Sequence, residues 1–254
     1  MPPSPTTAIV AEGLRKRFGD EVAVADLDLE IPAGTVYGFL GPNGAGKTTT
    51  IAMLTTLLRP TAGTATVAGE PIEDRDAVTP HIGYLPEDPP VYDELTGREQ
   101  LEYIAGLRDL AEGEAGDRID DLLGRFDLTA DADKRIGAYS KGMKQKTALV
   151  QAILHDPAVL FLDEPTSGLD PRAARTVRDV IAELAAGETT VVLSTHILPV
   201  VDELADVIGV MADGRLVAEG SPEALKQRAE GGERSLEEVF LEVTSEQVEV
   251  DGES

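Results

Sequence analysis

The chain has 254 residues, of which 47 are Asp or Glu and 22 are Lys or Arg, so its formal net charge at pH 7 is −25. Such a charge argues against a general nucleic-acid binder, because that class needs a basic face to neutralise phosphates. The sequence contains no cysteine, which excludes disulfides, zinc–thiolate sites and a cysteine nucleophile.

The acidic residues are spread along the whole chain rather than gathered in a tail. This distribution favours a protein adapted to molar salt, in which screening removes the self-repulsion of a carboxylate-rich surface. No apolar run approaches the ~20 residues that span a bilayer, and the first residues, MPPSPTT, lack the basic and apolar regions of a signal peptide. We therefore expect a cytoplasmic protein that reaches a membrane only through a partner.

The first 85 residues mix β-structure with one strand–loop–helix unit. Apolar residues alternate with one slip along EVAVADLDLEI (21–31), which predicts a half-buried strand with a bulge. The short strand TVYGFL (35–40) runs into glycines, and KTTTIAMLTTLL (47–58) is helical. GTATVAG (63–69) returns to strand character.

The glycine-rich stretch GPNGAGKTT (41–49) matches G-x-x-x-x-G-K-[ST] between an apolar strand and a helix, which is the context that a P-loop requires. Its glycines let backbone N–H groups turn toward phosphate oxygens, and the helix N-terminus adds its dipole. Lys47 is predicted to reach the β- and γ-phosphates, and Thr48 to ligate Mg²⁺. The alternative, a glycine-rich turn with an incidental lysine, requires a rare chance match. The predicted nucleotide-binding residues of this loop are Gly41, Pro42, Asn43, Gly44, Ala45, Gly46, Lys47, Thr48 and Thr49.

From about residue 91 to 155 the pattern becomes helical. Thr96 and Glu99 have the spacing of a capping box, and apolar residues follow at helical spacing as far as Leu110. A second helix is predicted to carry apolar residues as far as Phe126.

A lysine cluster lies in AYSKGMKQK (138–146), which holds three of the seven lysines of this acidic chain. Ser140 is predicted to cap a helix, whose apolar stripe follows from Ala148 to Ile153. The cluster could be a solvated helix face, or it could meet a ligand or a partner.

The run AVLFLDEP (158–165) is continuously apolar and ends in two acids, as expected for a buried parallel strand. Asp163 is placed where a Mg²⁺ ligand is needed opposite a P-loop, and Glu164 could accept a proton from an attacking water. The alternative is that these acids only cap the next element. The preceding P-loop favours the functional interpretation.

A further buried strand, TTVVLSTH (189–196), follows a helix that begins at Asp170-Pro171 and closes at Gly187. His196 could be structural, but the parallel sheet would place it on the phosphate edge, as a donor to the γ-phosphate. VIGVMADGRLVAEG (207–220) predicts a hairpin with an Asp-Gly turn.

The end of the chain predicts one more short helix. Ser235 and Glu238 have the spacing of a second capping box. The acidic end from about residue 245 is expected to fray.

These features follow one another in the order found in the ATP-binding subunits of ABC transporters, which the chain resembles from about residue 6 to 243. The combination of YLPED, YSKGMKQK and SLEEVFLEVT is most similar to exporter-type systems with separately encoded membrane proteins. With the acidic composition, the resemblance points to a halophilic archaeon. The matching parts are an aromatic before the P-loop (Phe18), Walker A (41–49), a Q-loop region (82–90), the signature (139–146), Walker B (159–164), the D-loop (167–170) and a switch histidine (His196).

The implied fold is α/β: a P-loop NTPase core with a mostly parallel sheet, an N-terminal antiparallel β subdomain and an inserted α-helical subdomain. A single ATPase domain would cover residues 6–243. Its parts would be the core with the β subdomain (6–90 and 156–220), the helical subdomain (about 91–155) and a C-terminal extension (221–243), with flexible ends at 1–5 and 245–254.

The resemblance also implies a head-to-tail dimer, with each of two ATPs held between one subunit's P-loop and the other's signature. Asp163 would hold Mg²⁺, Glu164 would be the general base, and His196 would orient the γ-phosphate. Phe18 would stack on adenine, although it could instead pack under the sheet.

Across the dimer interface, Ser140 and Gly142 would contact the γ-phosphate of the other subunit's ATP. Asp170 would communicate between the subunits. Lys141 lies in the same contact loop and is the lysine expected to meet nucleotide or partner. Lys144 and Lys146 are expected to face the membrane subunit or solvent.

The chain departs from the family pattern at three positions. Lys141 and Met143 stand for the first Gly and the Gln of the usual LSGGQ, and Glu87 stands where the Q-loop has Gln. A carboxylate can ligate Mg²⁺ but adds negative charge near three phosphates. The alternative is that Glu87 points into solvent.

The expected function is Mg²⁺-dependent ATP hydrolysis that drives integral-membrane permease subunits in separate chains, through a homodimer or a heterodimer with a paralogue. The motion would pass through the helical insert and the loop over residues 87–98. One rival is a soluble ABC ATPase of nucleic-acid maintenance or translation; the other is an assembly factor with weak hydrolysis. The 92 residues between Lys47 and Ser140 leave room only for a helical subdomain, not for a long coiled coil.

Overall fold

The computed structural model describes residues 7–187, 189–228, 237 and 240. The predicted capping box of Ser235 and Glu238, most of the predicted extension over 221–243, and the predicted flexible ends therefore lie outside the described residues. Among the helices that the structure describes, none is both long enough and apolar enough to cross a membrane.

The centre of the molecule is a six-stranded sheet with the order β10-β9-β3-β8-β7-β6. All neighbours in it run parallel except β9 and β10, which form the predicted hairpin with a turn at Asp213-Gly214. Its strands are β3 (Val36–Leu40), β6 (Ile82–Leu85), β7 (Val159–Asp163), β8 (Thr190–Thr195), β9 (Val207–Ala212) and β10 (Arg215–Gly220).

A second, antiparallel sheet has the order β2-β1-β4-β5. The predicted bulge lies in β2, where Asp26 has a φ of 56° and the pairing with β1 shifts. Its strands are β1 (Thr7–Phe18), β2 (Glu21–Pro32), β4 (Ala62–Val67) and β5 (Glu70–Pro71). The predicted fold class, with an antiparallel N-terminal sheet beside a mostly parallel one, is confirmed.

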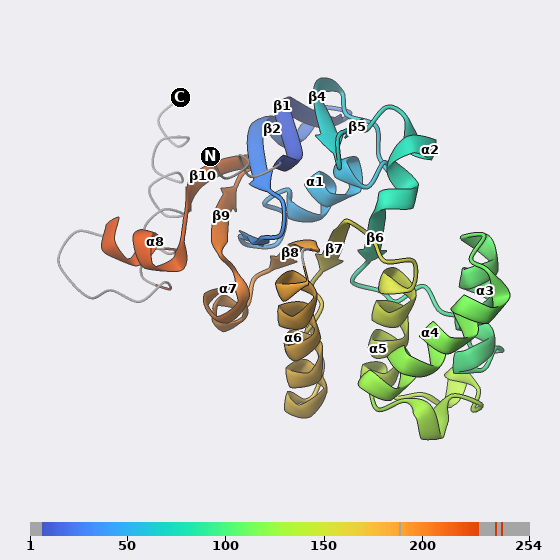
Figure 1. Cartoon of the computed structure of the whole chain (residues 1–254). Helices are drawn as coiled ribbons and strands as arrows, with labels where there is room; N and C mark the ends of the chain where they lie inside the picture. The colour runs from blue at the N-terminus through green and yellow to red at the C-terminus, as the bar shows by residue number, and fades with distance from the viewer. Residues whose placement is uncertain (1–6, 188, 229–236, 238–239, 241–254) are drawn as a thin grey trace, which may run out of the picture.

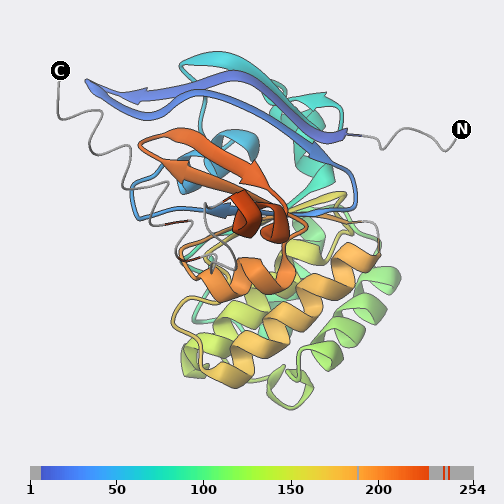
Figure 2. The same cartoon turned by 90° about the vertical axis from the view of Figure 1, so that its left-hand side faces the viewer.

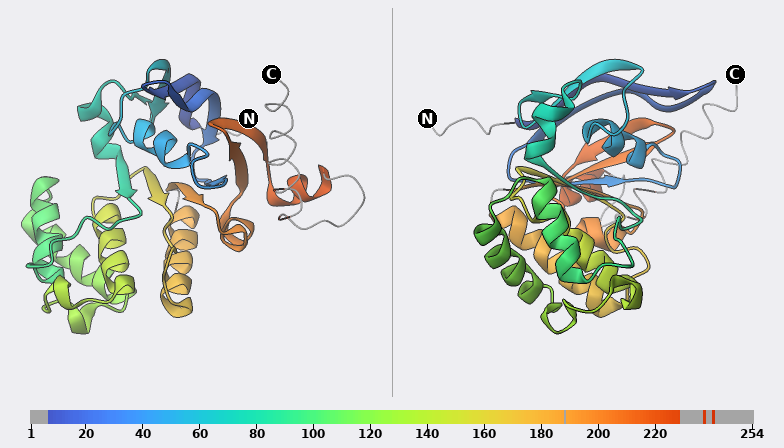
Figure 3. Two further views of the ribbon diagram at one scale, coloured as in Figure 1. Left: turned by 180° about the vertical axis from the view of Figure 1, so that it is seen from behind. Right: turned by 90° about the vertical axis from the view of Figure 1, so that its right-hand side faces the viewer.

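The helices are arranged on both sides of the central sheet, as Figures 1 and 2 show. Helix α1 lies between the two sheets, whereas α5, α6 and α7 cover the opposite face. Seen from behind, α3 and α4 stand together beside α5 (Figure 3). The helices are α1 (Lys47–Leu54), α2 (Arg75–Val78), α3 (Gly97–Leu107), α4 (Glu112–Arg125), α5 (Lys141–Ile153), α6 (Pro171–Ala186), α7 (Leu198–Leu204) and α8 (Pro222–Arg228).

The central strands are buried on both faces, which explains their continuous apolar sequences. In β7, for example, Phe161 joins a core cluster with α1 and the antiparallel sheet, whereas Leu160 and Leu162 join a cluster with the helices on the other face. The two layers therefore hold the central sheet from both sides.

The predicted caps at Thr96 and Ser140 are confirmed. Thr96 and Glu99 exchange the two bonds of a capping box, with Thr96 Oγ1 accepting from the Glu99 N–H at 3.1 Å and the Thr96 N–H donating to Glu99 Oε2 at 2.8 Å. Ser140 Oγ accepts from the Met143 N–H at 3.2 Å at the start of α5.

Three predicted helix ends were wrong, and left-handed backbone explains the first two. Helix α1 ends at Leu54 rather than at residue 58, because Thr56 has a φ of 62°. Leu110 lies beyond the end of α3, after Asp109 with a φ of 53°. Phe126 follows the last residue of α4 but is fully buried, so its apolar character reflects the core and not the helical period.

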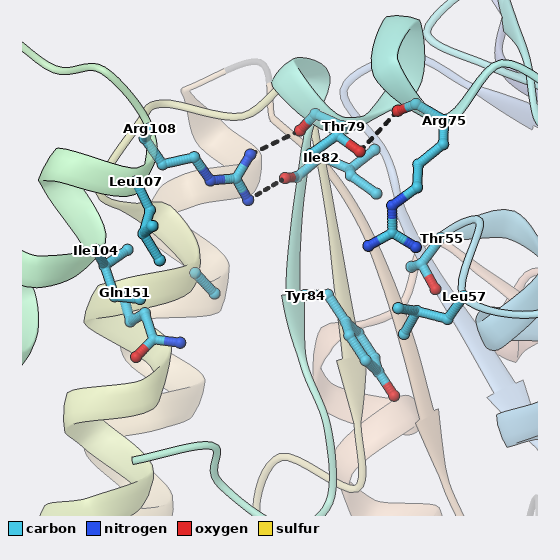
Figure 4. A pocket seen from close by; sticks show the side chains of 11 residues that line it. Thr55, Leu57, Arg75, Thr79, Ile82, Tyr84, Ile104, Leu107, Arg108 and Gln151 are labelled. Atoms are coloured by element: carbon cyan, nitrogen blue, oxygen red, sulfur yellow. Dashed lines mark hydrogen bonds between the residues drawn. The ribbon is translucent and has the colours of Figure 1, made fainter. Parts of the chain in front are cut away.

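Two polar side chains join the helices to the start of β6 by way of the Ile82 carbonyl oxygen. Arg108 donates to the carbonyl oxygens of Thr79 at 2.7 Å and Ile82 at 3.4 Å (Figure 4), and His155 Nε2 lies 2.9 Å from the Ile82 oxygen. Within the described part of the chain, the buried Nδ1 of His155 has no hydrogen-bond partner. Burial, and next the positive charge of Arg108, lower the pKa of His155 to about 4.

The lowered pKa of His155 predicts a loss of stability in mild acid. Between pH 6.5 and about 4 the unfolded chain binds a proton on this histidine that the folded chain does not, so stability falls as the pH falls through this window. The free energy of unfolding of the wild-type protein should therefore fall between pH 7 and pH 4.5. We expect this fall to be about 2 kcal/mol smaller in His155→Gln, after allowance for solvent screening. Urea titrations of both proteins at pH 7 and pH 4.5 measure the difference, with His81→Gln as the control. An unchanged pH dependence in His155→Gln would contradict the prediction.

Candidate functional site

The loop over residues 41–46 connects β3 to α1 and packs tightly against its surroundings. Gly44 and Gly46 have φ values of 84° and 100°, in the left-handed region that favours glycine. A Cβ at Gly46 would lie 2.5 Å from the Ala23 carbonyl oxygen, and a Cβ at Gly41 would collide with the Met211 carbonyl oxygen. The loop can therefore hold its backbone N–H groups inward only with glycine at these positions.

Lys47 is buried and folds back over this loop. Its ammonium donates to the carbonyl oxygens of Gly41 at 2.8 Å and Pro42 at 3.1 Å. Burial lowers the pKa of Lys47, while the negative charges of Glu164, Asp163 and Glu87 oppose that effect. The loop lysine thus lies among three carboxylates.

Asp163 ends strand β7 beside the start of α1. Its Oδ1 accepts a hydrogen bond from Thr48 Oγ1 at 3.2 Å and a short one from Ser194 Oγ. Burial, and next the charge of Asp163, raise the pKa of Tyr84 to about 12, so this tyrosine stays neutral. Two oxygen ligands suited to a small dication, Thr48 and Asp163, are therefore adjacent.

Glu164 follows directly and is held from strand β8. Its Oε2 accepts from Thr195 Oγ1 at 3.0 Å, and its Oε1 accepts from the His196 N–H at 3.1 Å and faces His196 Nδ1 at 2.8 Å. The Glu164 carboxylate is therefore held by Thr195 and by both the backbone and the ring of His196.

The loop, Lys47, Thr48 and Glu164 line one cleft of about 440 Å³, together with Phe18, Glu87 and His196. Asp163 does not line the cleft and is joined to it by its hydrogen bond with Thr48. Phe18 is half exposed at the end of β1 and borders the cleft. The Lys16 ammonium lies 5.1 Å from the centre of its ring and donates to the Arg59 carbonyl oxygen at 2.7 Å. Glu87 is exposed to solvent, yet its side chain borders the cleft.

The signature residues Ser140, Lys141 and Gly142 do not line this cleft, and neither does Asp170 of the D-loop. Asp170 caps α6 by accepting from the N–H groups of Arg172 and Ala173 at 3.0 Å each, and these bonds hold its pKa below the usual range. A Cβ at Gly142 would lie 3.1 Å from the Cβ of Ala173. The chain therefore brings the sequence-predicted residues together in two groups.

Two lysines of the cluster have partners within the subunit. Lys144 forms an ion pair with Asp93 at 2.6 Å, and Lys146 donates to the Phe126 carbonyl oxygen at 3.0 Å. The sequence did not predict either of these partners. They join the start of α5 to neighbouring parts of the helical region.

Sequence reasoning missed Ser194 and Thr195, which hold Asp163 and Glu164. A signal was present, since two hydroxyl residues end an otherwise apolar strand directly before His196. Hydroxyls at such an edge can serve the acids of the neighbouring strand. Lys16 was missed as well, because nothing in its sequence context places it on the ring of Phe18.

A glycine-rich phosphate loop opposite paired carboxylates at one edge of a mostly parallel sheet defines a P-loop nucleotide hydrolase. Residues 24–167 match the family model described as ABC transporter. The chain is 45% identical over 229 residues to a daunorubicin resistance ATP-binding protein of Streptomyces coeruleorubidus, covering 90% of this chain and 72% of that protein. It is 37% identical to a bacitracin transport ATP-binding protein of Bacillus licheniformis, covering 88% and 72%.

Among solved structures, one described as an ATP binding subunit of an ABC transporter superposes with a TM-score of 0.86 at 30% identity, covering 93% of this chain and 99% of the other. The chain belongs to the ABC transporter family. It is an ATP-binding and ATP-hydrolysing subunit that powers a transporter, and the family match favours this function over a soluble ATPase of assembly or nucleic-acid maintenance.

The hydroxyl of Thr195 is expected to matter for turnover, because it orients the Glu164 carboxylate. Thr195→Val keeps the side-chain shape and removes one hydrogen bond to a charged group. We expect kcat for ATP hydrolysis to fall by about fivefold while KM stays unchanged.

The matched control is Thr190→Val at the opposite end of β8, where the hydroxyl accepts from the Gly34 N–H at 3.0 Å far from the cleft. That variant should lose stability without losing kcat. Equal kcat values for the two variants would refute the role of Thr195. Steady-state phosphate release and thermal unfolding are the measurements.

Proposed function

We propose that this subunit powers an exporter, by forming a head-to-tail dimer around two ATPs and driving separate permease subunits in the membrane. The observation that carries the proposal is that the predicted site residues lie in two separate places on one subunit. The loop, Glu164, Glu87 and His196 share one cleft, whereas the signature residues lie outside it on the same chain. The names of relatives, daunorubicin resistance and bacitracin transport, support export as the direction.

ATP would lie in the cleft with its phosphates on the loop over residues 41–49. Lys47 would turn its ammonium from the loop carbonyls toward the β- and γ-phosphates, where negative charge offsets its desolvation. Phe18 would stack on adenine, with the Lys16 ammonium over its ring.

The residues present fit Mg²⁺. Among the described residues, no cluster of three or more His, Cys, Asp or Glu side chains could hold a metal ion by itself. This agrees with a cation that takes one or two protein ligands and completes its shell with phosphates and water. Thr48 and Asp163 would be the ligands, and Glu87 on the rim of the cleft could contribute a third. When bound, Mg²⁺ would neutralise phosphate charge.

Glu164 would act as the general base. A water oxygen attacks the γ-phosphorus, its proton passes to the Glu164 carboxylate, and the bond to the β–γ bridging oxygen breaks to leave ADP and phosphate. His196 would orient the γ-phosphate through Nε2 while Nδ1 remains on Glu164. Burial and the hydrogen bond from Thr195 hold the carboxylate in place for this role.

The second subunit would supply Ser140, Lys141 and Gly142 to the γ-phosphate, and Asp170 would communicate across the interface. The N-terminus of α5, which Ser140 caps, is suited to this contact because a helix N-terminus favours an anion. The partner could be a second copy of this chain or a paralogue. A nucleic acid is not expected, given the charge of −25.

The permease would contact the surface around a second cavity, between α3 and α5 on one side and α2 and β6 on the other (Figure 4). Leu57 and Leu107 line it and are 53% and 63% exposed. Arg75 and Arg108 line it too and give this acidic protein a local positive charge. An apolar segment bearing a carboxylate would fit, and it would adjoin the loop over residues 87–98. The subunit would then be peripheral on the cytoplasmic face.

We treat residues 6–243 as one ATPase domain, made of the core with the β subdomain (6–90 and 156–220), the helical subdomain (about 91–155) and an extension (221–243). The helical subdomain is supported by α3, α4 and α5, which lie together in Figure 3 and contact one another. A source in a halophilic archaeon is supported by the charge of −25 and by acids spread over the whole chain.

Glu164→Gln tests the ATPase mechanism. The amide keeps the shape and cannot take a proton, so we expect turnover to fall at least about a hundredfold with ATP affinity retained. Phosphate release and equilibrium binding of labelled ATP measure the two effects. The exposed carboxylate of Glu12, changed to Gln, is the matched control. Substantial residual hydrolysis in Glu164→Gln would remove this residue as the base.

Adaptation to salt is tested by dialysis from about 3 M KCl into dilute buffer, where the Debye length grows from a few ångströms to tens. We expect the far-ultraviolet circular dichroism of the folded protein to be lost in dilute buffer and to return with salt. Recovery on restoring KCl is the control for irreversible damage. Full stability in dilute buffer would contradict a halophilic origin.

A further inference from the structure

A buried glutamine lies within the first two turns of α5, directly behind the signature. Gln145 is 1% exposed, and its Nε2 donates to the Pro165 carbonyl oxygen at 3.3 Å. Within the described part of the chain, its buried Oε1 has no hydrogen-bond partner. A buried unpaired carbonyl oxygen destabilises the fold, so stability alone does not explain an amide at this position.

The accepting residue follows Glu164, whose backbone is strained. Glu164 has a φ of 49°, a region that side-chain-bearing residues rarely adopt, and the residue before a proline is restricted further. Such a conformation persists only where its surroundings hold it. Here the Glu164 N–H donates to the Ser194 carbonyl, the Ser167 N–H donates to the Glu164 carbonyl, both at 3.0 Å, and Gln145 holds the next carbonyl along the chain.

The same turns of α5 contact the D-loop (167–170), which follows Glu164 along the chain. The Lys141 side chain lies across Gly168, where an added Cβ would collide with its ammonium. Gly142 lies against Ala173, because a Cβ added at Gly142 would lie only 3.1 Å from the Cβ of Ala173. The start of α5 therefore lies along the chain from Pro165 to Ala173, next to the strained Glu164.

We propose that Gln145 is a positioning residue for Glu164, which links the signature turn to the general base of the same subunit. Through Pro165, it holds the backbone that aims the Glu164 carboxylate. When the signature residues of one subunit move against the ATP bound by the other subunit, the movement is passed through Gln145 and Pro165 to Glu164 of the first subunit. The inference rests on the proposed role of Glu164 as the base.

Gln145→Met separates positioning from packing. Methionine fills a similar volume, loses the donor to Pro165 and also removes the unpaired oxygen. We expect kcat to fall about five- to tenfold at unchanged KM for ATP, while the midpoint of urea unfolding stays the same or rises. Steady-state phosphate release and urea titration, both at the working salt concentration, give the two numbers.

The control is Gln100→Met, at a buried glutamine whose amide is fully paired. Gln100 accepts from the Tyr92 N–H at 3.1 Å and donates to Gln151 at 2.9 Å, so its loss should lower stability and leave kcat unchanged. If Gln145→Met does not accumulate, Gln145→Leu is measured in the same way.

The outcomes distinguish the inference from the function on which it rests. An unchanged kcat in the Gln145 variants, or a fall in kcat that only follows a fall in stability, overturns the positioning role. Abolished turnover in Glu164→Gln together with unchanged kcat in Gln145→Met overturns this inference alone. Full turnover in Glu164→Gln overturns the proposed base, and the inference with it.

Discussion

The parallel pairing of β3, β7 and β8 is the constraint on which the site depends. Leu40 lies opposite Thr195, and Asp163 lies opposite Ser194, so the carboxyl ends of three strands meet at one edge. The phosphate loop, the two acids and the histidine each follow one of these ends. A shift of register by one residue would turn every one of these side chains to the other face of the sheet. The two apolar layers that bury the sheet therefore also set the geometry of the site.

An acidic protein that binds the negatively charged phosphates of ATP needs positive charge at the binding site itself. Here the supply is the buried Lys47 and the backbone N–H groups at the start of α1, surrounded by Asp163, Glu164 and Glu87. In the molar salt that we propose for this protein, the screening length is about 3 Å, so only groups in contact with the phosphates act on them. The large negative charge of the remaining surface then costs little at the site.

The lysine cluster that stood out in the sequence has been divided by the structure. Lys144 and Lys146 bind neighbouring parts of the helical region, whereas Lys141 lies over the D-loop at Gly168. The departure from the usual glycine at position 141 therefore has a steric consequence within the subunit. Together with Gln145, it makes the signature turn and the segment that follows Glu164 one packed unit.

Local patterns determined much of this protein. The loop over residues 41–49, the capping box at Thr96 and the buried strands were predictable because glycine, cap and apolar signals act between residues close in sequence. The helix ends after Leu54 and Leu107 were not, since left-handed residues ended the helices while the apolar period continued. Only the tertiary structure decided that Thr195 holds Glu164, that Lys16 covers Phe18 and that Gln145 reaches Pro165. Each of these contacts joins two segments that the packing of the sheet, the hairpin and α5 brings together. The spacing of residues along the chain does not determine how far apart such segments lie.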